Sequence, residues 1–346
     1  MKYPSLSIVI AAYNSGRIIG DCLESVKNQT YPKSKIEIIV SDGGSKDQTL
    51  KIAKSYGAGI IQVKGSQGAE INRARGVKQA KNELLLLIDH DNILPYKSWL
   101  QDMVEPLLKD SQIVAVETLR YHYDPKSTLL DRYFSLLGIS DPLPYYLGKA
   151  DRSSYASAVY EGPGKVIDCG TYYQVEFDSN KIPTLGANGF IIRRKLLMQH
   201  AKTDPEHFFH IDVNVDLIRK GFRRYAFVKN SIIHQTHHMD FWHYLKRRKL
   251  FMEKYYFTDF SKRRYSVYEK KDAARLIYFI IISLTIIKPL YDSVKGYLKV
   301  RDPAWFLHPL MCFGMVVVYG YTIFKWQTDR FLKQFKTIFG KKRVWI

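Results

Sequence analysis

The chain has 346 residues, enough for one large domain or two smaller ones with a sizeable core. An apolar share of 46%, with 25 Tyr and 18 Phe, excludes a disordered chain. A formal charge of +20 favours an anionic partner, which leaves nucleic acid, a membrane surface or a phosphorylated small molecule. The scattered cysteines, Cys22, Cys169 and Cys312, argue against zinc and disulfide frameworks and favour a reducing compartment.

Residues 6–88 alternate between short apolar runs and stretches with helical periodicity. We expect strands at 6–12, 36–40, 59–63 and 83–88, and helices at 18–29, 48–56 and 69–80. Continuous apolar strands separated by helices indicate an α/β fold whose parallel sheet is covered on both faces. Ligands of such sheets bind at the carboxyl ends of the strands, so the residues that follow each strand are the first candidates for a site.

The pattern loosens between residues 98 and 194, and a helix at 212–220 and a strand at 225–228 follow. Beyond residue 240 the character changes. Residues 242–257 are aromatic and basic, and residues 276–287 and 306–324 are almost purely apolar. We therefore expect a domain of residues 1–240, with halves 1–95 and 96–240, and a separate C-terminal region of residues 241–346.

The second expected strand runs into an acidic, glycine-containing turn, Ser41-Asp42-Gly43-Gly44-Ser45. Two glycines permit a tight turn and close approach of a ligand to the backbone, and Asp42 would accept hydrogen bonds from a ribose or a base. An ordinary turn that leads into a helix cap at Ser45 or Asp47 is the alternative.

The fourth expected strand ends in Asp89-His90-Asp91. Clustered carboxylates are costly unless a cation compensates them, and a divalent ion that also binds a diphosphate would do so. The alternative is a polar loop in which Asn92 caps a helix.

With the opening strand, these motifs resemble the family-2, inverting glycosyltransferases of the GT-A fold. Residues 7–14, Ser-Ile-Val-Ile-Ala-Ala-Tyr-Asn, are similar to the first strand of that family, and residues 22–32 to its first helix and exit. Asp89-His90-Asp91 stands where the DxD motif of the family coordinates a metal. Arg73 stands near the arginine that often precedes the metal strand, and Ala74 departs from the asparagine that commonly follows.

The resemblance implies a nucleotide-diphosphate sugar across the strand ends, held through Mn²⁺ or Mg²⁺. The residues that it implies in donor binding are Ala11, Tyr13, Asp42, Arg73, Asp89, His90 and Asp91. The implied metal ligands are Asp91 and Asp89, with His234 after the strand at 225–228. His237 and His238 lie close by, but zinc is disfavoured because no cysteine accompanies them.

The segment Gly186-Ala187-Asn188-Gly189-Phe190 resembles the acceptor-side segment of the subgroup that builds bacterial and archaeal exopolysaccharides. Glycine lets a backbone approach sugar hydroxyls, and the Asn188 amide both donates and accepts hydrogen bonds. The resemblance therefore makes Asn188 and Gly189 acceptor-binding residues. A simple turn before a strand is the alternative.

The expected helix at 212–220 begins with the candidate general base. Members of the family carry a Glu-Asp pair here, whose aspartate deprotonates the acceptor hydroxyl. Asp212 matches that aspartate, whereas Ile211 replaces the glutamate. Asp216, one turn later on the same face, is the second candidate. Alternatively, Asp212 only complements the helix dipole.

The apolar stretches of the C-terminal region predict membrane association. Residues 306–324 are close to the length of a span, with Trp305 and Trp326 and basic residues at the flanks. A hairpin or an in-plane anchor is favoured, with the catalytic part on the cytoplasmic face. The alternative is a pair of buried helices in a soluble domain. The basic run Lys246–Lys249 is interpreted as a lipid-phosphate or headgroup contact, or as a solvated helix face.

The sequence thus predicts an inverting, metal-dependent glycosyltransferase that acts on a hydroxyl of a lipid-linked or polysaccharide acceptor. Two alternatives stay open: a polyprenyl-phosphate sugar synthase, and a non-catalytic membrane scaffold with the same fold. Nucleic-acid binding is disfavoured because no recognition module accompanies the charge.

Overall fold

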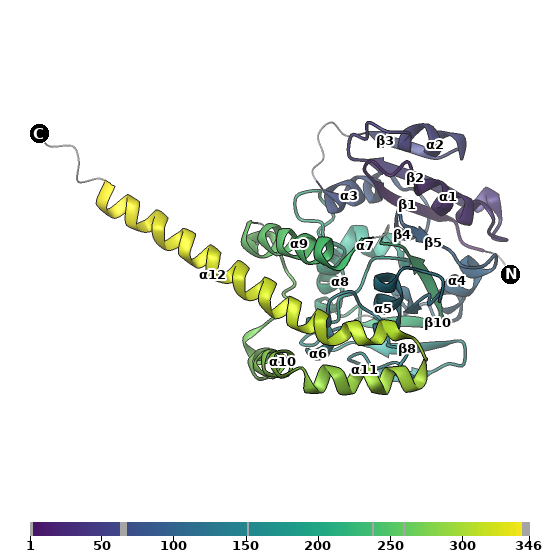
Figure 1. Ribbon diagram of the computed structural model, residues 1–346. Helices are drawn as coiled ribbons and strands as arrows, with labels where there is room; N and C mark the ends of the chain where they lie inside the picture. The colour runs from purple at the N-terminus through teal and green to yellow at the C-terminus, as the bar shows by residue number, and fades with distance from the viewer. Residues whose placement is uncertain (1–2, 63–67, 151, 237–238, 259, 341–346) are drawn as a thin grey trace, which may run out of the picture.

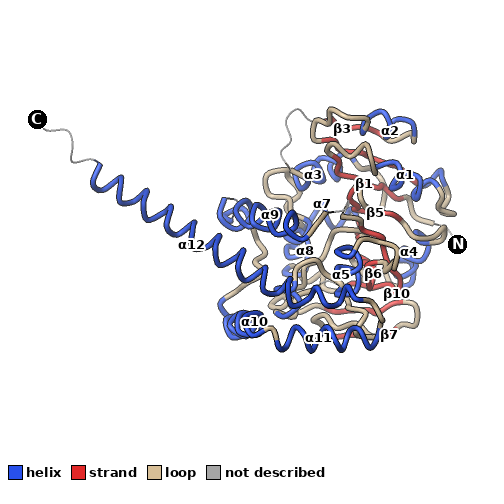
Figure 2. Tube along the Cα trace, in the orientation of Figure 1, coloured by secondary structure: helices blue, strands red, loops and turns tan. Residues whose placement is uncertain are grey.

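The computed structural model describes residues 3–62, 68–150, 152–236, 239–258 and 260–340. A central twisted sheet carries helices on its faces, and the last helix projects away from this body (Figure 1). Figure 2, coloured by secondary structure, shows the strands together, with helices and loops around them. The α/β layering predicted from the sequence is confirmed.

Among the described residues, ten strands form one sheet in the order β3-β2-β1-β4-β9-β6-β10-β8-β7, and β5 pairs with β10. The strands are β1 Leu6–Ala12, β2 Ile36–Asp42, β3 Gly59–Gln62, β4 Leu84–Asp89, β5 Asn92–Ile93, β6 Ala115–Tyr121, β7 Lys165–Asp168, β8 Tyr172–Glu176, β9 Phe190–Arg193 and β10 Arg224–His234. The first four are parallel, and in their register Ala12 faces Asp42 while Ala11 faces Asp89. Two acidic strand ends therefore flank the end of β1.

Helices cover this sheet and then extend beyond it. They are α1 Ile19–Lys27, α2 Thr49–Ser55, α3 Ala69–Gln79, α4 Trp99–Lys109, α5 Leu129–Leu137, α6 Pro142–Tyr146, α7 Arg194–His200, α8 His210–Arg219, α9 Phe241–Met252, α10 Ala273–Thr285, α11 Ile287–Lys299 and α12 His308–Gly340. The helices predicted over residues 18–29, 48–56, 69–80 and 212–220 all form, with ends shifted by at most a few residues.

Two differences from the predicted strands matter for the site. β9 runs antiparallel between β4 and β6, so the sheet is mostly rather than wholly parallel. β10 is much longer than the predicted strand at 225–228 and continues to His234, which pairs with Asn92 of β5. Because of this extension, His234 lies directly beside the end of the Asp89-His90-Asp91 motif. Val63, in the predicted strand at 59–63, lies outside the described residues.

Apolar residues form three cores, and the third core joins the two predicted regions. The first two cores cover the two faces of the sheet. The third core packs α5 against residues of α9, α10 and α12, and its members include Tyr133 and Phe134 as well as Tyr244, Phe279 and Met311. A boundary at residue 240 therefore runs through a shared core.

The C-terminal helices leave many large apolar side chains exposed. Ile287 and Leu298 on α11 are 75% and 73% exposed, and Ile277 on α10 is 57% exposed. By length and composition, one described helix is able to cross a membrane, in the segment Pro303–Phe335. The pair α10–α11 meets the same criterion only when its helices are taken together, across a bend of 83°. The basic run on α9 is partly internal, because Arg248 pairs with Asp141 at 2.5 Å.

Candidate active site at the strand ends

The turn after β2 is held by the carboxylate of Asp42, which is fully buried. Its Oδ2 accepts the backbone N–H groups of Gly44 and Ser45, each at 2.9 Å, and the Ser45 hydroxyl donates to Oδ1. Asp42, the predicted nucleoside residue, thus also stabilises the ordinary turn that the sequence left as an alternative.

Gly43 allows this turn to lie against two other side chains. A Cβ at Gly43 would approach Asn72 Nδ2 to 2.8 Å and Tyr13 Cδ2 to 3.4 Å. Asn72 is buried on α3, whereas the Tyr13 ring is 47% exposed at the end of β1. An exposed aromatic ring beside an acidic turn offers a surface on which a nucleobase can stack.

A buried ionic network links α3 to the end of β4. Arg73 Nη2 donates to Asp89 Oδ1 and Arg73 Nη1 to Glu70 Oε1, both at 2.5 Å. Burial alone would raise the pKa of both carboxyl groups, but the Arg73 guanidinium outweighs it and holds each pKa below its usual value. Asp89 and Glu70 therefore stay ionised, and one buried guanidinium lies between them.

Asp91 lies beside His234. Asp89 and Asp91 do not form one ligand cluster, because Asp89 pairs with Arg73 instead. His234 Nε2 is 3.6 Å from Asp91 Oδ2, and the His234 ring packs on Tyr121 with centroids 5.6 Å apart. Within the described ranges, no group of three or more His, Cys, Asp or Glu side chains is arranged to hold a metal ion. Of the three predicted metal ligands, the structure brings two together, and Asp89 is engaged by Arg73.

The middle residue of the motif points back to β1. His90 Nδ1 lies 3.1 Å from the carbonyl oxygen of Ala11, and Asn92 Oδ1 accepts the backbone N–H of Asp89 at 2.9 Å. Ala11 is buried and contributes only backbone here. These contacts fix the path of the motif across the sheet edge.

Both predicted bases are occupied by arginines. Arg263 donates from Nε and Nη2 to the two oxygens of the fully buried Asp212 carboxylate, each at 3.0 Å, and the Arg264 backbone N–H adds a third bond at 2.9 Å. Asp216 pairs with Arg264 at 2.8 Å. Both oxygens of the Asp212 carboxylate are therefore already engaged by hydrogen-bond donors. These contacts favour a structural role for Asp212.

His210, the first residue of α8, is a residue that the sequence did not single out. Its ring Nδ1 lies 2.9 Å from Glu70 Oε1, and its backbone N–H donates to Glu70 Oε2 at 3.0 Å. Arg73 Nη1 is 3.3 Å from the same ring nitrogen. If Nδ1–H donates to Glu70, Nε2 keeps a basic lone pair, and it has no partner among the residues that the structure describes.

The predicted acceptor segment lies on the N-terminus of α8. Gly186 has a φ of +110°, and a Cβ there would meet the carbonyl oxygen of His210 at 2.5 Å. Asn188, with a φ of +57°, donates from Nδ2 to the Tyr121 hydroxyl at 3.1 Å. The buried Arg152 donates to the Asn188 carbonyl oxygen at 2.7 Å. Gly189, also at positive φ, leaves room for Ile232 and Trp99 and directly precedes β9.

Two of the residues that were not predicted carried a signal in the sequence. Glu70 lies three residues before Arg73 on one helix, which is the spacing of an ion pair. His210 lies two residues before the predicted base. Arg152 belongs to an irregular segment, and its partners Glu117 and Asn188 are far away in the sequence.

A mostly parallel sheet with acidic strand ends, and with an antiparallel β9 that leads from the acceptor segment, defines the GT-A class of fold. The sequence profile described as Glycosyl transferase family 2 matches residues 7–200. The chain belongs to glycosyl transferase family 2.

Similar proteins agree with this assignment. Glycosyltransferase AglE of Haloferax volcanii is 31% identical over 137 residues, which cover 38% of this chain and 45% of that protein. Poly(ribitol-phosphate) beta-glucosyltransferase of Bacillus spizizenii is 38% identical over 104 residues, 28% of this chain and 16% of that protein. The matched region thus spans less than half the length of these relatives.

Among solved structures, the fold is similar to that of mannosyltransferase PcManGT from Pyrobaculum calidifontis, solved with GDP-Man and Mn²⁺. The TM-score is 0.52 at 15% identity, and the match covers 94% of this chain and 88% of that one. The family and these relatives are glycosyltransferases by name.

Proposed function

We propose that the chain is a metal-dependent inverting glycosyltransferase that moves a sugar from a nucleotide diphosphate to a hydroxyl of a lipid-linked or polysaccharide acceptor. One observation carries the proposal: in a chain of family 2, the Asp89-His90-Asp91 strand end meets Arg73 on one side and His234 on the other. A non-catalytic scaffold would not need these charged and polar side chains to be gathered at the end of β4.

The donor is proposed to lie across the ends of β1, β2 and β4. The Tyr13 ring offers a stacking face for the base, and the turn of Asp42 offers backbone and carboxylate contacts to the ribose. Asp91 and His234 are an oxygen and an imidazole donor side by side, a set that suits Mn²⁺ or Mg²⁺. A bound ion would supply Lewis-acid neutralisation of the departing nucleoside diphosphate.

His210 is the base that the contacts favour. It lies between the Arg73–Asp89 pair on the donor side and the Gly186–Asn188 segment on the acceptor side. Glu70 orients the ring and would stabilise the imidazolium formed when Nε2 takes a proton. Asp212 remains the alternative base, on the condition that Arg263 releases it.

The proposed reaction is a single displacement. The acceptor oxygen forms a bond to the anomeric carbon while the bond from that carbon to the diphosphate oxygen breaks. The leaving nucleoside diphosphate keeps the electron pair, and the hydroxyl proton passes to His210 Nε2. Attack opposite to the leaving group inverts the configuration at the anomeric carbon.

A phosphate acceptor is the second candidate, and a cation-rich cavity favours it. The charged and histidine side chains that line this cavity of about 220 Å³ are Lys254, Lys262, Arg263, Glu70, Glu206 and His207. A polyprenyl phosphate would need no general base, since it is already an anion. Transfer that survives substitution of both His210 and Asp212 would select this alternative.

We further propose that the C-terminal helices hold the catalytic part at the cytoplasmic face of a membrane. The support is the exposed apolar surface of α10–α12 and the positive charge of the chain. Flotation with anionic vesicles tests this part separately, and a protein that stays at the bottom of the gradient contradicts it.

The function is tested by turnover of a panel of UDP-, GDP- and dTDP-sugars with detergent-purified full chain, in Mn²⁺, Mg²⁺ or EDTA. We expect one donor to be consumed, loss of turnover in EDTA, and a fall of roughly 10²-fold or more in Asp91→Ala. The matched control is Asp21→Asn, an exposed carboxylate on α1.

The results separate the alternatives. Turnover that is equal in EDTA and in Asp91→Ala contradicts metal dependence. The absence of both nucleotide binding and turnover, in a folded protein, supports the scaffold instead.

A further inference from the structure

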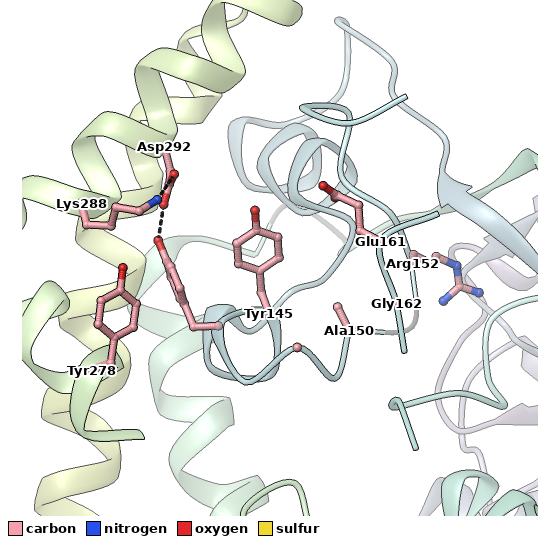
Figure 3. A pocket seen from close by; sticks show the side chains of 10 residues that line it. Tyr145, Ala150, Arg152, Glu161, Gly162, Tyr278, Lys288 and Asp292 are labelled. Carbon is pink, nitrogen blue, oxygen red and sulfur yellow. Dashed lines mark hydrogen bonds and ion pairs between the residues drawn. The ribbon is translucent and has the colours of Figure 1, made fainter. Parts of the chain in front are cut away.

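A second cavity of about 310 Å³ lies between the transferase body and the C-terminal helices. Its described lining comes from α6, from the segment after it, and from α10 and α11: Tyr145, Tyr146, Gly148, Ala150, Arg152, Glu161, Gly162, Tyr278, Lys288 and Asp292. In Figure 3 the Tyr145 ring stands between the Lys288–Asp292 pair and Glu161. The volume is at the lower end of the range for small-molecule sites.

The aromatic wall of this cavity is held in place by hydrogen bonds. Tyr146 donates to Asp292 Oδ2 at 2.8 Å and accepts from His308 Nε2 at 2.9 Å, and Tyr133 donates to His308 Nδ1 at 2.8 Å. A neutral imidazole satisfies both bonds to His308. The Tyr145 ring meets that of Tyr146 edge-on at 5.3 Å. These contacts fix the position of the Tyr146 ring without a ligand.

Both cations of the described lining are already engaged in ion pairs, and Glu161 adds a further carboxylate. Arg152 pairs with the buried Glu117 at 2.9 Å, and Lys288 pairs with Asp292 on the same helix. An anionic group would have to break one of these pairs, which is costly for the buried one. The cavity lined by Lys254 and Lys262 offers an anion two lysines besides the paired Arg263. The tyrosine cavity suits a neutral ligand with many hydroxyl groups.

The inner end of the cavity reaches the proposed reaction centre through Arg152. Besides pairing with Glu117, its guanidinium donates to the carbonyl oxygen of Asn188 at 2.7 Å and to the Tyr121 hydroxyl at 3.1 Å. Tyr121 packs on His234, which lies beside Asp91. A chain of contacting side chains, Arg152, Tyr121 and His234, thus links the cavity to Asp91 at the end of β4.

We infer that this cavity is a subsite for the neutral carbohydrate part of the acceptor, with Tyr145, Tyr146 and Tyr278 as its stacking and hydrogen-bonding wall. The inference rests on the proposed function, which it deepens by naming the class of acceptor that the site takes. Tyr278 is 46% exposed on α10, so it forms the membrane-side rim of the subsite. The sugar of a lipid-linked acceptor would enter there while its lipid stays along the apolar surface of α10 and α11.

Saturation-transfer NMR on the detergent-solubilised full chain tests the subsite. The probes are the methyl glycosides of glucose, galactose, mannose and N-acetylglucosamine, and dodecyl phosphate is the anionic competitor. We expect at least one glycoside to bind, Tyr278→Ala to weaken it roughly tenfold, and Tyr278→Phe to weaken it less. Tyr291→Ala, which removes an exposed tyrosine of α11 outside the cavity lining, is the matched control and should bind as the unaltered chain does.

Three outcomes overturn the subsite: no glycoside binds, Tyr278→Ala and Tyr291→Ala bind alike, or dodecyl phosphate displaces the glycoside. Donor turnover in the same samples distinguishes failure of the subsite from failure of the proposed function. If the chain turns over a donor but Tyr278→Ala binds the glycoside as the unaltered chain does, the subsite is wrong and the proposed function stands. If glycoside binding depends on Tyr278 but no donor is turned over, the proposed function is wrong and the subsite stands.

Discussion

The proposed donor side and the proposed acceptor side of the site are built in different ways. The donor side consists of the ends of β1, β2 and β4, three neighbouring parallel strands whose register places Ala12, Asp42 and Asp89 together. The acceptor side is assembled from an irregular segment, the turn before β9, the start of α8 and helices near the C-terminus.

The two sides owe their residues to different causes. Sheet topology positions the residues of one side, and tertiary packing positions those of the other. On the donor side, a polar residue is at the site because its strand ends there. On the acceptor side, Arg152 is at the site because Glu117, Tyr121 and Asn188 surround it. Substitutions on the two sides should therefore fail in different ways.

The largest effect is expected where the two sides meet, at His210. In His210→Ala, kcat for transfer should fall by roughly 10²–10⁴-fold because no positioned base remains. His210→Gln, which can still hydrogen-bond to Glu70, should not restore it. Steady-state transfer with the donor found by the panel measures the change.

Asp212→Asn is the matched comparison for His210. It should lower stability, since it removes the charge that compensates Arg263, and leave kcat within a few-fold of the unaltered chain. A folded Asp212→Asn without transfer, beside an active His210→Ala, would restore Asp212 as the base.

The next largest effect tests the packing that builds the acceptor side. Arg152→Ala leaves the carboxylate of Glu117 buried without its partner, and we expect a loss of about 3–5 kcal/mol in the free energy of unfolding. Chemical denaturation measures it, with exposed Arg17→Ala as the control. A loss no greater than that in the control would mean that the acceptor wall does not depend on this ion pair.

The same contrast explains what the sequence could predict. The strands that end in Asp42 and Asp89 were predicted because each is an apolar run bounded by a turn, which is a local signal. The pairing of Asp212 with Arg263 could not be predicted, because the two residues lie 51 positions apart and no pattern connects them. The tyrosine cavity has the same origin, since Tyr146, Asp292 and His308 come together only through tertiary packing.

A smaller effect is expected from crowding the donor turn. In Gly43→Ala the new Cβ would press on Asn72 and Tyr13, and overpacking of this kind costs roughly 1–3 kcal/mol. Donor KM should rise more than acceptor KM, because the displaced side chains belong to the donor side. Gly20→Ala, whose Cβ would meet only Ile52 at 3.9 Å, is the control. Equal effects on both substrates would mean that the two sides are coupled through this turn.

The smallest effect is expected from the exposed ring of Tyr13. Because nearly half of its surface is open, Tyr13→Ala should leave stability almost unchanged and raise donor KM roughly two- to tenfold through lost stacking. Tyr13→Phe should bind the donor normally, since stacking needs the ring and not the hydroxyl. Isothermal titration with the nucleoside diphosphate measures this directly, with exposed Tyr321→Ala on α12 as the control. If Tyr13→Phe binds as weakly as Tyr13→Ala, the hydroxyl rather than the ring holds the nucleotide, and the donor side relies on hydrogen bonding there.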